Sequence, residues 1–228
     1  NHRKILEGVA QFIGAESEFM NFTVALDKLS KIGNDGVIKL LHSQGFTSSA
    51  IERLKPFLTL EGNFETKLAS VAKALEGIEI AEEGIDELKF IYNQLNRQPL
   101  KAVNLKFDIT LARGLNYYTG LILEVMPPEG IEIGSIGGGG RYDNLTDLFG
   151  LNNTSGFGIS FGFDRIFLVL EELNLFPSNL DEKVKLMFSN FGDDSVIFCF
   201  DQLIKLRDKH FPCELYPKPV KLKKQLNY

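Results

Sequence analysis

Apolar positions in the first hundred residues recur at helical spacing. The apolar segment at residues 3–12 predicts a short helix. A second helix, which should stop at Gly33, is predicted by Ala25, Leu26, Leu29 and Ile32. One face of a further helix, ending before Pro99, is marked by Ile85, Leu88, Ile91, Tyr92 and Leu95. These amphipathic helices carry no obvious chemistry, so packing is their expected role.

The period changes from helical to two at residue 105. A half-buried strand is predicted by the alternating apolar residues Leu105, Phe107, Ile109 and Leu111. Arg113 follows in the same phase, so its guanidinium should face the buried side unless the backbone breaks at Gly114. A charge there is costly without a partner, and an anionic ligand is one way to supply it.

A glycine-rich stretch follows a second predicted strand at residues 121–126, in which Leu121, Leu123 and Val125 form the apolar set. Residues 137–140 are four consecutive glycines, followed by Arg141, Tyr142 and Asp143. Such a run lets a backbone approach a ligand closely, or it forms a flexible hairpin. It has neither the Gly-Lys-Ser/Thr ending of a P-loop nor the spacing of a dinucleotide fingerprint.

Residues 156–170 predict a strand, a tight turn at Gly162 and a buried helix with Arg165 in its first turn. Helix starts favour anions, so a phosphate beside Arg165 is one interpretation. A salt bridge from Arg165 to Asp164 or Glu172 is the alternative. After Pro177 a strand at 184–188, a helix at 195–209, a strand at 213–216 and a helix from 220 suggest a separate α/β domain.

Composition indicates a globular protein and excludes several classes. The chain has 228 residues, 44% hydrophobic and 24% charged, with no apolar run long enough for a membrane span and no signal peptide pattern, so we expect a soluble, cytoplasmic protein. Cys199 and Cys213 lack metal-ligand or redox spacing and are expected to be free thiols, and three scattered histidines add no zinc pattern.

Charge is distributed unevenly. The net charge of −5 argues against indiscriminate binding of nucleic acid. Residues 183–228, however, contain nine Lys or Arg against five Asp or Glu, a net of +4. This basic segment either contacts a phosphate backbone or is simply a solvated surface.

The motifs taken together resemble the catalytic domain of histidyl-tRNA synthetase, a class II aminoacyl-tRNA synthetase. Residues 111–120 (LARGLNYYTG) look like the first histidine signature of that family, and residues 138–143 (GGGRYD) like the second. Residues 156–170 are similar to class II motif 3, and residues 1–6 to the segment after motif 2. The order and spacing agree along nearly the whole chain, although residues 15–95 match only loosely.

The resemblance implies an α+β fold, with an antiparallel sheet flanked by helices. It implies four regions: residues 1–14 after motif 2, a helical insertion at 15–100, the catalytic core at 101–178, and a partial α/β anticodon-binding domain at 179–228. The chain begins without Met, so we expect a fragment. Motifs 1 and 2 would precede Asn1, and without the motif 2 arginine the fragment should be inactive alone. Asn116 departs from the family's usual Asp, which puts the local hydrogen bonds around the tyrosines in doubt.

The resemblance also implies substrates and roles. The complete enzyme would use ATP with Mg²⁺, L-histidine and tRNA(His), act as a homodimer, and have no membrane partner. Arg113 would be catalytic and bind both histidine and ATP, and Gly162 and Arg165 would bind ATP. The remaining expected histidine-binding residues are Tyr117, Tyr118, Gly138, Gly139, Gly140 and Tyr142. No carboxylate cluster identifies magnesium ligands.

Two alternatives stay open at this stage. A catalytically inactive paralogue that regulates histidine biosynthesis would share the core but usually lacks the anticodon-binding domain. An unrelated glycine-rich nucleotide-binding module would explain the glycines but not the ordered motifs.

Overall fold

The computed structural model describes residues 1–97, 103–113, 117–177 and 184–227. The chain divides into two compact units, Asn1–Val169 and Leu170–Tyr228. The first unit contains, in order, α1 (Arg3–Ile13), η1 (Glu16–Glu18), α2 (Phe19–Asp27), α3 (Leu29–Ser43), α4 (Ser48–Leu58), α5 (Phe64–Ala74), α6 (Glu79–Arg97), β1 (Ile122–Val125), β2 (Gly137–Tyr142), η2 (Leu145–Phe149) and β3 (Gly156–Phe161), and α7 (Phe163–Glu172) spans the boundary. Helices and an antiparallel sheet together make the fold α+β, as the sequence predicts.

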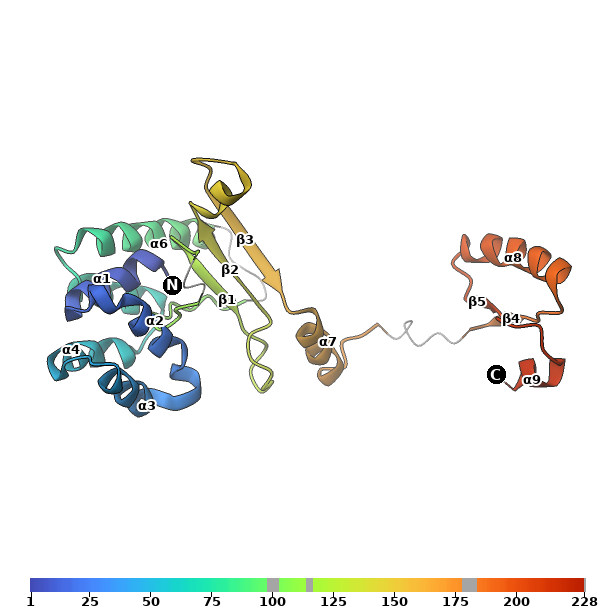
Figure 1. The fold of residues 1–228 in the computed structure, drawn as a ribbon, viewed down its shortest axis with the longest axis horizontal. Coiled ribbons are helices and arrows are strands. Elements are labelled where there is room, and N and C mark those ends of the chain that lie inside the picture. The colour runs from blue at the N-terminus through green and yellow to red at the C-terminus, as the bar shows by residue number, and fades with distance from the viewer. Residues whose placement is uncertain (98–102, 114–116, 178–183, 228) are drawn as a thin grey trace. The chain divides into compact units, whose positions relative to one another are not determined.

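Helices α1 to α6 form the packed body of the first unit, on the β1 side of the sheet (Figure 1). The helix predicted at residues 3–12 is α1, which His2 caps by accepting a hydrogen bond from the Lys4 backbone N–H. Gly14, in the left-handed region at φ 74°, ends it. The helix predicted before Pro99 is α6, whose last described residue is Arg97.

The second predicted helix is divided. Its residues lie in α2 and in the start of α3, and the two helices meet at Lys28. Gly33 breaks the helical geometry with φ 67° and ψ 175°, as predicted, but the helix resumes beyond it to Ser43. Local spacing marks the break correctly, but it does not show that the chain continues in the same conformation afterwards.

Close packing of α1 against α6 depends on small residues. A methyl group added at Gly8 would lie 2.4 Å from Cβ of Ala81, which is fully buried in α6. We therefore expect Gly8→Ala to lower the free energy of unfolding by about 1–3 kcal/mol, because overpacking outweighs alanine's better helix propensity. Chemical unfolding measures this, with Gly138→Ala as the control, since a methyl group added there would meet only the Leu123 carbonyl, at 3.4 Å. Equal stability of the two variants would contradict the packing argument.

The prediction of a strand at residues 105–112 is wrong. Phe107 and Ile109 are buried, as the alternation requires, but residues 103–113 form no strand. Asp108 instead makes a turn by accepting hydrogen bonds from the backbone and hydroxyl of Thr110. The carbonyls of Ile109 and Leu111 accept hydrogen bonds from the Asn1 side chain rather than from a neighbouring strand.

The sheet has the order β1-β2-β3, and both pairings are antiparallel. The four glycines belong to its middle strand, with Gly139 opposite Leu123 on β1 and Ile159 on β3, so the flexible hairpin is not what this run forms. The strands predicted at 121–126 and 156–161 are confirmed as β1 and β3.

Two details of burial were predicted wrongly. In β1 the fully buried residue is Ile122, which lies outside the predicted apolar set, because apolar side chains on both faces leave the phase of this strand ambiguous. In α7 only Val169 is buried among the described residues, while Phe167 and Leu168 are about half exposed. An apolar run indicates a helix that can be buried, but it does not supply the elements that would cover it.

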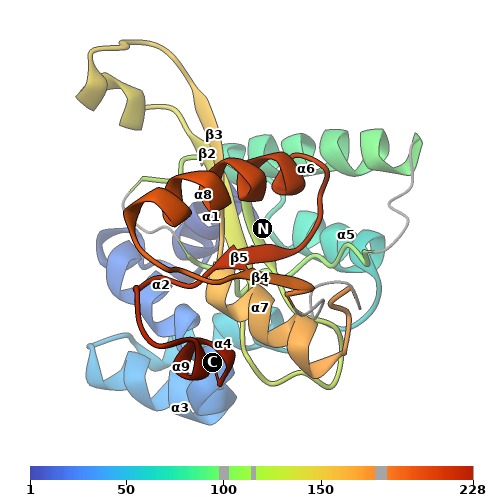
Figure 2. The ribbon, with the colours of Figure 1, turned by 90° about the vertical axis from the view of Figure 1, so that its right-hand side faces the viewer.

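The second unit has a parallel pair of strands, β4 (Leu186–Phe188) and β5 (Cys213–Leu215), with α8 (Asp193–Arg207) packed beside them (Figure 2). The side-chain amide of buried Gln225, in α9 (Leu222–Leu226), bonds to both backbone N–H and carbonyl of Asn190. The predicted alternation of strands and helices is therefore confirmed. No helix within the described residues is long and apolar enough to cross a membrane.

Candidate functional site

An open hollow of about 520 Å³ lies on the first unit, over the glycine-rich strand. It is lined by Asp27, Arg113, Tyr117, Tyr118, Leu123, Glu124, Ser135, Ile136, Gly137, Gly138, Gly139, Ser160, Gly162 and Arg165. Seven of the nine residues predicted to form the site are in this set. The two others, Gly140 and Tyr142, are not.

Three glycines of β2, Gly137, Gly138 and Gly139, form the floor of the hollow, and they differ in the space around them. A methyl group added at Gly138 would meet only the Leu123 carbonyl, at 3.4 Å. At Gly139 it would lie 2.1 Å from the Gly158 carbonyl oxygen, inside the sheet. The lack of a side chain at Gly138 therefore leaves space in the hollow, while the lack of one at Gly139 lets β2 and β3 come close enough to pair.

Arg113 lies at one side of this floor, between two carboxylates that the sequence analysis did not single out. Its Nε is 2.9 Å from Oε1 of Glu124 on β1 and 3.7 Å from Oδ1 of Asp27 at the end of α2. The sequence predicted that the Arg113 guanidinium needs a partner, and in the structure its partners are these two carboxylates. The arginine side chain is nevertheless about half exposed, so it remains accessible to a ligand in the hollow.

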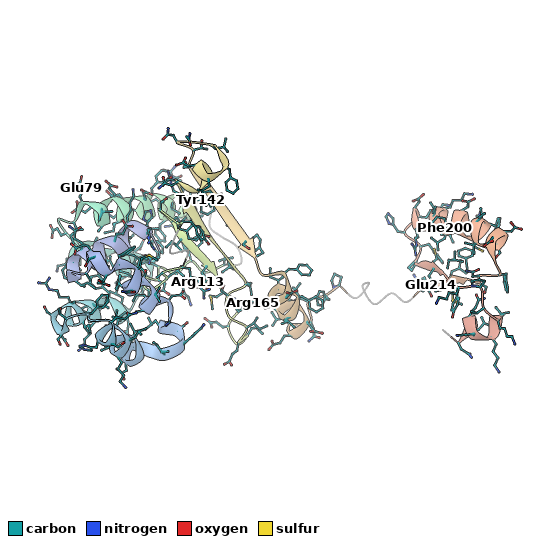
Figure 3. The ribbon with its side chains drawn as sticks, viewed as in Figure 1. Glu79, Arg113, Tyr142, Arg165, Phe200 and Glu214 are labelled. Carbon is teal, nitrogen blue, oxygen red and sulfur yellow. The ribbon has the colours of Figure 1, made fainter. Side chains whose placement is uncertain are left out.

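Arg165 comes from the first turn of α7, on the β3 side of the hollow (Figure 3). Its Nη1 donates a 2.6 Å hydrogen bond to the Ser135 carbonyl, rather than pairing with Asp164 or Glu172 as the alternative interpretation required. The backbone N–H of Gly162 donates to the Ile136 carbonyl at 2.8 Å. These two bonds fix the start of α7 against the segment that enters β2.

Two adjacent tyrosines complete the wall. The rings of Tyr117 and Tyr118 meet edge to face, with centroids 4.4 Å apart. Burial, together with a hydrogen bond to Tyr117, raises the pKa of Tyr118 to about 12, so its hydroxyl keeps its proton at neutral pH. The Tyr118 ring lies against Gly140, where an added methyl group would be 2.9 Å from Cδ1. Gly140 thus supports the tyrosine from outside the hollow.

Tyr142 lies farther along the sheet from the two arginines (Figure 3), with its ring against Gly156 and Gly158. Next to it, Asp143 accepts hydrogen bonds from the Thr119 hydroxyl at 2.6 Å and from Nε of Arg141 at 3.0 Å. The Thr119 hydrogen bond and then the Arg141 guanidinium hold the pKa of Asp143 below its usual range. This cluster ties the two histidine-signature segments together.

The sequence analysis missed two charged residues of the site, Glu124 and Asp27, for different reasons. Glu124 lies two residues from buried Ile122, on the same side of β1, so a correct phase would have pointed to it. Asp27 lies among helices without chemical motifs, and nothing in the spacing marks it. Among the described residues no group of three or more His, Cys, Asp or Glu could hold a metal ion.

This arrangement is suited to anionic ligands. Two guanidinium groups reach the hollow from different parts of the chain, and glycines let a ligand lie against the backbone between them. Tyrosine hydroxyls add polar groups that can distinguish one ligand from another, while the two carboxylates pair with Arg113.

Comparisons with known proteins agree with this geometry. The family described as histidyl-tRNA synthetase matches residues 1–166. Curated histidine–tRNA ligases from Christiangramia forsetii and Flavobacterium johnsoniae are each 49% identical over all 228 residues of this chain, covering 50% and 48% of their own lengths. The chain therefore spans about half the length of the curated relatives that it matches.

Solved structures give the same result. The match to a histidyl-tRNA synthetase from Nostoc sp. PCC 7120 covers the whole of this chain and 54% of the Nostoc chain, with a TM-score of 0.74 and 25% identity. A Bacillus halodurans protein, titled as an ATP phosphoribosyltransferase regulatory subunit/histidyl-tRNA synthetase, has a TM-score of 0.66 at 20% identity over the whole chain and 56% of its own, a likeness of fold alone. With its signature segments gathered at one hollow and the family match extending over residues 1–166, the chain belongs to the histidyl-tRNA synthetase family.

Proposed function

We propose that the complete protein containing this chain is a histidine–tRNA ligase, which activates histidine with ATP and transfers it to tRNA(His). The observation that carries the proposal is the convergence of Arg113, Arg165 and the two tyrosines on one glycine-floored hollow. The identity of 49% to curated histidine–tRNA ligases over the whole chain supports it.

In the first step a carboxylate oxygen of histidine attacks the α-phosphorus of ATP. A new P–O bond forms, the bond to the β-phosphate oxygen breaks, and pyrophosphate leaves. Both reactants are anions, so the site must neutralise charge and hold the attack in line. Arg113 is the group proposed to bridge carboxylate and α-phosphate, because its planar set of donors can contact two oxygens at once.

Other residues have proposed roles in binding. One tyrosine hydroxyl, of Tyr117 or Tyr118, would contact the imidazole. Tyr142 is the third tyrosine proposed to help bind histidine, and its interaction with Tyr118 helps to raise the pKa of Tyr118. Gly138 and Gly139, which line the hollow, would let histidine lie close to the strand. Gly140 would help bind histidine indirectly, by leaving room for the Tyr118 ring. Gly162 and Arg165 would contact ATP.

Further parts of the proposal concern the whole protein. ATP would be bound with Mg²⁺, and the protein would act in the cytoplasm as a homodimer. Residues 179–228 would belong to an anticodon-binding domain that contacts tRNA(His), where the exposed lysines Lys218, Lys221, Lys223 and Lys224 offer cations to phosphates. The bounds of the catalytic core, 101–178, and of the helical insertion, 15–100, remain predictions.

The test is charging of tRNA(His) with radiolabelled histidine by the complete protein. We expect charging that requires ATP and histidine and is absent with other amino acids. Because the 228-residue chain spans only half of its relatives, we expect activity at background from it alone. A complete protein that binds histidine but charges no tRNA would instead fit the regulatory paralogue, which no comparison favours over the synthetase.

The tyrosines provide a prediction about specificity. If a hydroxyl contacts the imidazole, Tyr→Phe at that position should raise the KM for histidine and leave the KM for ATP nearly unchanged, because a lost polar contact affects only the ligand that used it. Exchange kinetics of Tyr117→Phe and Tyr118→Phe measure both values. Equal changes for histidine and ATP, or none in either variant, would remove the tyrosines from this role.

A further inference from the structure

Arg113 is held by two carboxylates of different character. Glu124 is on β1, its carboxylate oxygen is 2.9 Å from Nε, and its side chain is 17% exposed. Asp27 is at the last residue of α2, 3.7 Å away, and its side chain is 45% exposed. The charged groups that line the hollow are these three residues and Arg165.

The contact with Glu124 is the stronger of the two. Electrostatic attraction increases as the distance falls and as solvent is removed, and exposed ion pairs contribute little. Asp27, farther away and half exposed, is therefore the partner that an incoming anion can replace. Glu124 is anchored by a paired strand, whereas Arg113 belongs to a segment without strand or helix.

The Glu124 contact is not yet an aligned hydrogen bond. Its Oε1 is buried and, among the residues that the structure describes, receives no hydrogen bond despite the short distance to Arg113. Catalytic hydrogen bonds are often poorly aligned without substrate and tighten when it binds. Glu124 can thus accept an aligned N–H when the guanidinium turns toward a ligand.

We propose that Glu124 is a positioning residue, which holds the inner nitrogen of Arg113 so that the outer end of the guanidinium is presented to the reacting anions. This inference rests on the proposed function, in which Arg113 contacts carboxylate and α-phosphate. A long arginine side chain on an irregular segment needs such support, because a site works only when its groups are fixed to within about 0.5 Å. The carboxylate does not itself touch the substrate in this account.

The test is pyrophosphate exchange by the complete protein carrying Glu124→Gln. We expect kcat to fall by about 10- to 100-fold, the scale of a misplacement of roughly 1 Å, with the KM for ATP within about twofold of wild type. The matched control is Glu129→Gln, which removes the same charge from a side chain that is 99% exposed and 4.0 Å from Lys106. The control should retain wild-type kinetics.

A double-mutant cycle separates positioning from structural support. If Glu124 acts through Arg113, Glu124→Gln should cause little further loss in an Arg113→Ala background. An equal loss in both backgrounds, or a kcat like that of Glu129→Gln, would overturn the inference. If Glu124→Gln lowers the Tm, Glu124→Asp takes its place in the same cycle, since it keeps the charge but shortens the reach.

The outcomes also distinguish this inference from the function on which it rests. Absence of histidine-dependent exchange in the wild-type complete protein would refute the proposed function. Loss of exchange in Arg113→Ala, with none in Glu124→Gln, would refute only the positioning role.

Discussion

Arg113→Ala in the complete protein should lower histidine-dependent pyrophosphate exchange by on the order of 10²–10³-fold, because removing one preorganised charged donor costs that much where charge develops. Binding of the substrates should weaken less than kcat, since the proposed contact is strongest in the transition state. Steady-state exchange kinetics at varied histidine and ATP measure both.

A matched arginine provides the control for this effect. Arg97 is exposed at the end of α6 and is not among the residues that line the hollow. Arg97→Ala removes the same charge and should leave exchange unchanged. Near-wild-type exchange in Arg113→Ala would show that the arginine has no part in the reaction, whatever its place in the structure.

Gly139→Ala should have the other large effect, on the fold and on the site together. The added methyl group would lie 2.1 Å from the Gly158 carbonyl oxygen and 2.9 Å from the Ile159 Cα, both backbone atoms of the paired strand β3. Since backbone cannot give way as a side chain does, we expect a loss of about 1–3 kcal/mol or more in the free energy of unfolding. Exchange should fall on the order of 10²-fold as the floor of the hollow shifts.

The neighbouring Gly138 separates these two effects. Its added methyl group has 3.4 Å to the nearest atom and enters the hollow. Gly138→Ala should keep the Tm of wild type and raise the KM for histidine. Thermal unfolding and exchange kinetics on both variants check this contrast, and equal Tm values would contradict the strand packing described here.

Sequence patterns predicted most of the elements of this fold. Periodicity located α1, α6, β1, β3 and the strands and helices of the second unit. It failed at residues 105–112, where the alternation and burial agree with a strand. There the carbonyls bond to Asn1, a residue more than a hundred positions away, and Asp108 makes a turn. Alternation indicates which side chains are buried, but strand pairing depends on distant backbone that local spacing does not describe.

The candidate site was predictable for a different reason. Its arginines, tyrosines and glycines were found because the ordered motifs resemble a family, whereas each motif alone left alternatives open. Asp27 was missed because a lone carboxylate on a helix is usually a solvated group, and only the folded chain brings it to 3.7 Å from Arg113. Glu124 was missed because Leu121, Ile122 and Leu123 obscure the phase of β1.

The most direct test of the central claim is ATP–pyrophosphate exchange by the purified complete protein, with and without histidine at about 10 mM, roughly ten times the upper end of common KM values. If Arg113 and its neighbours belong to a histidine-activating site, exchange should appear only when histidine is present. Histidine binding measured by calorimetry in a sample that catalyses no exchange would contradict the account, because the hollow would then bind the amino acid without activating it.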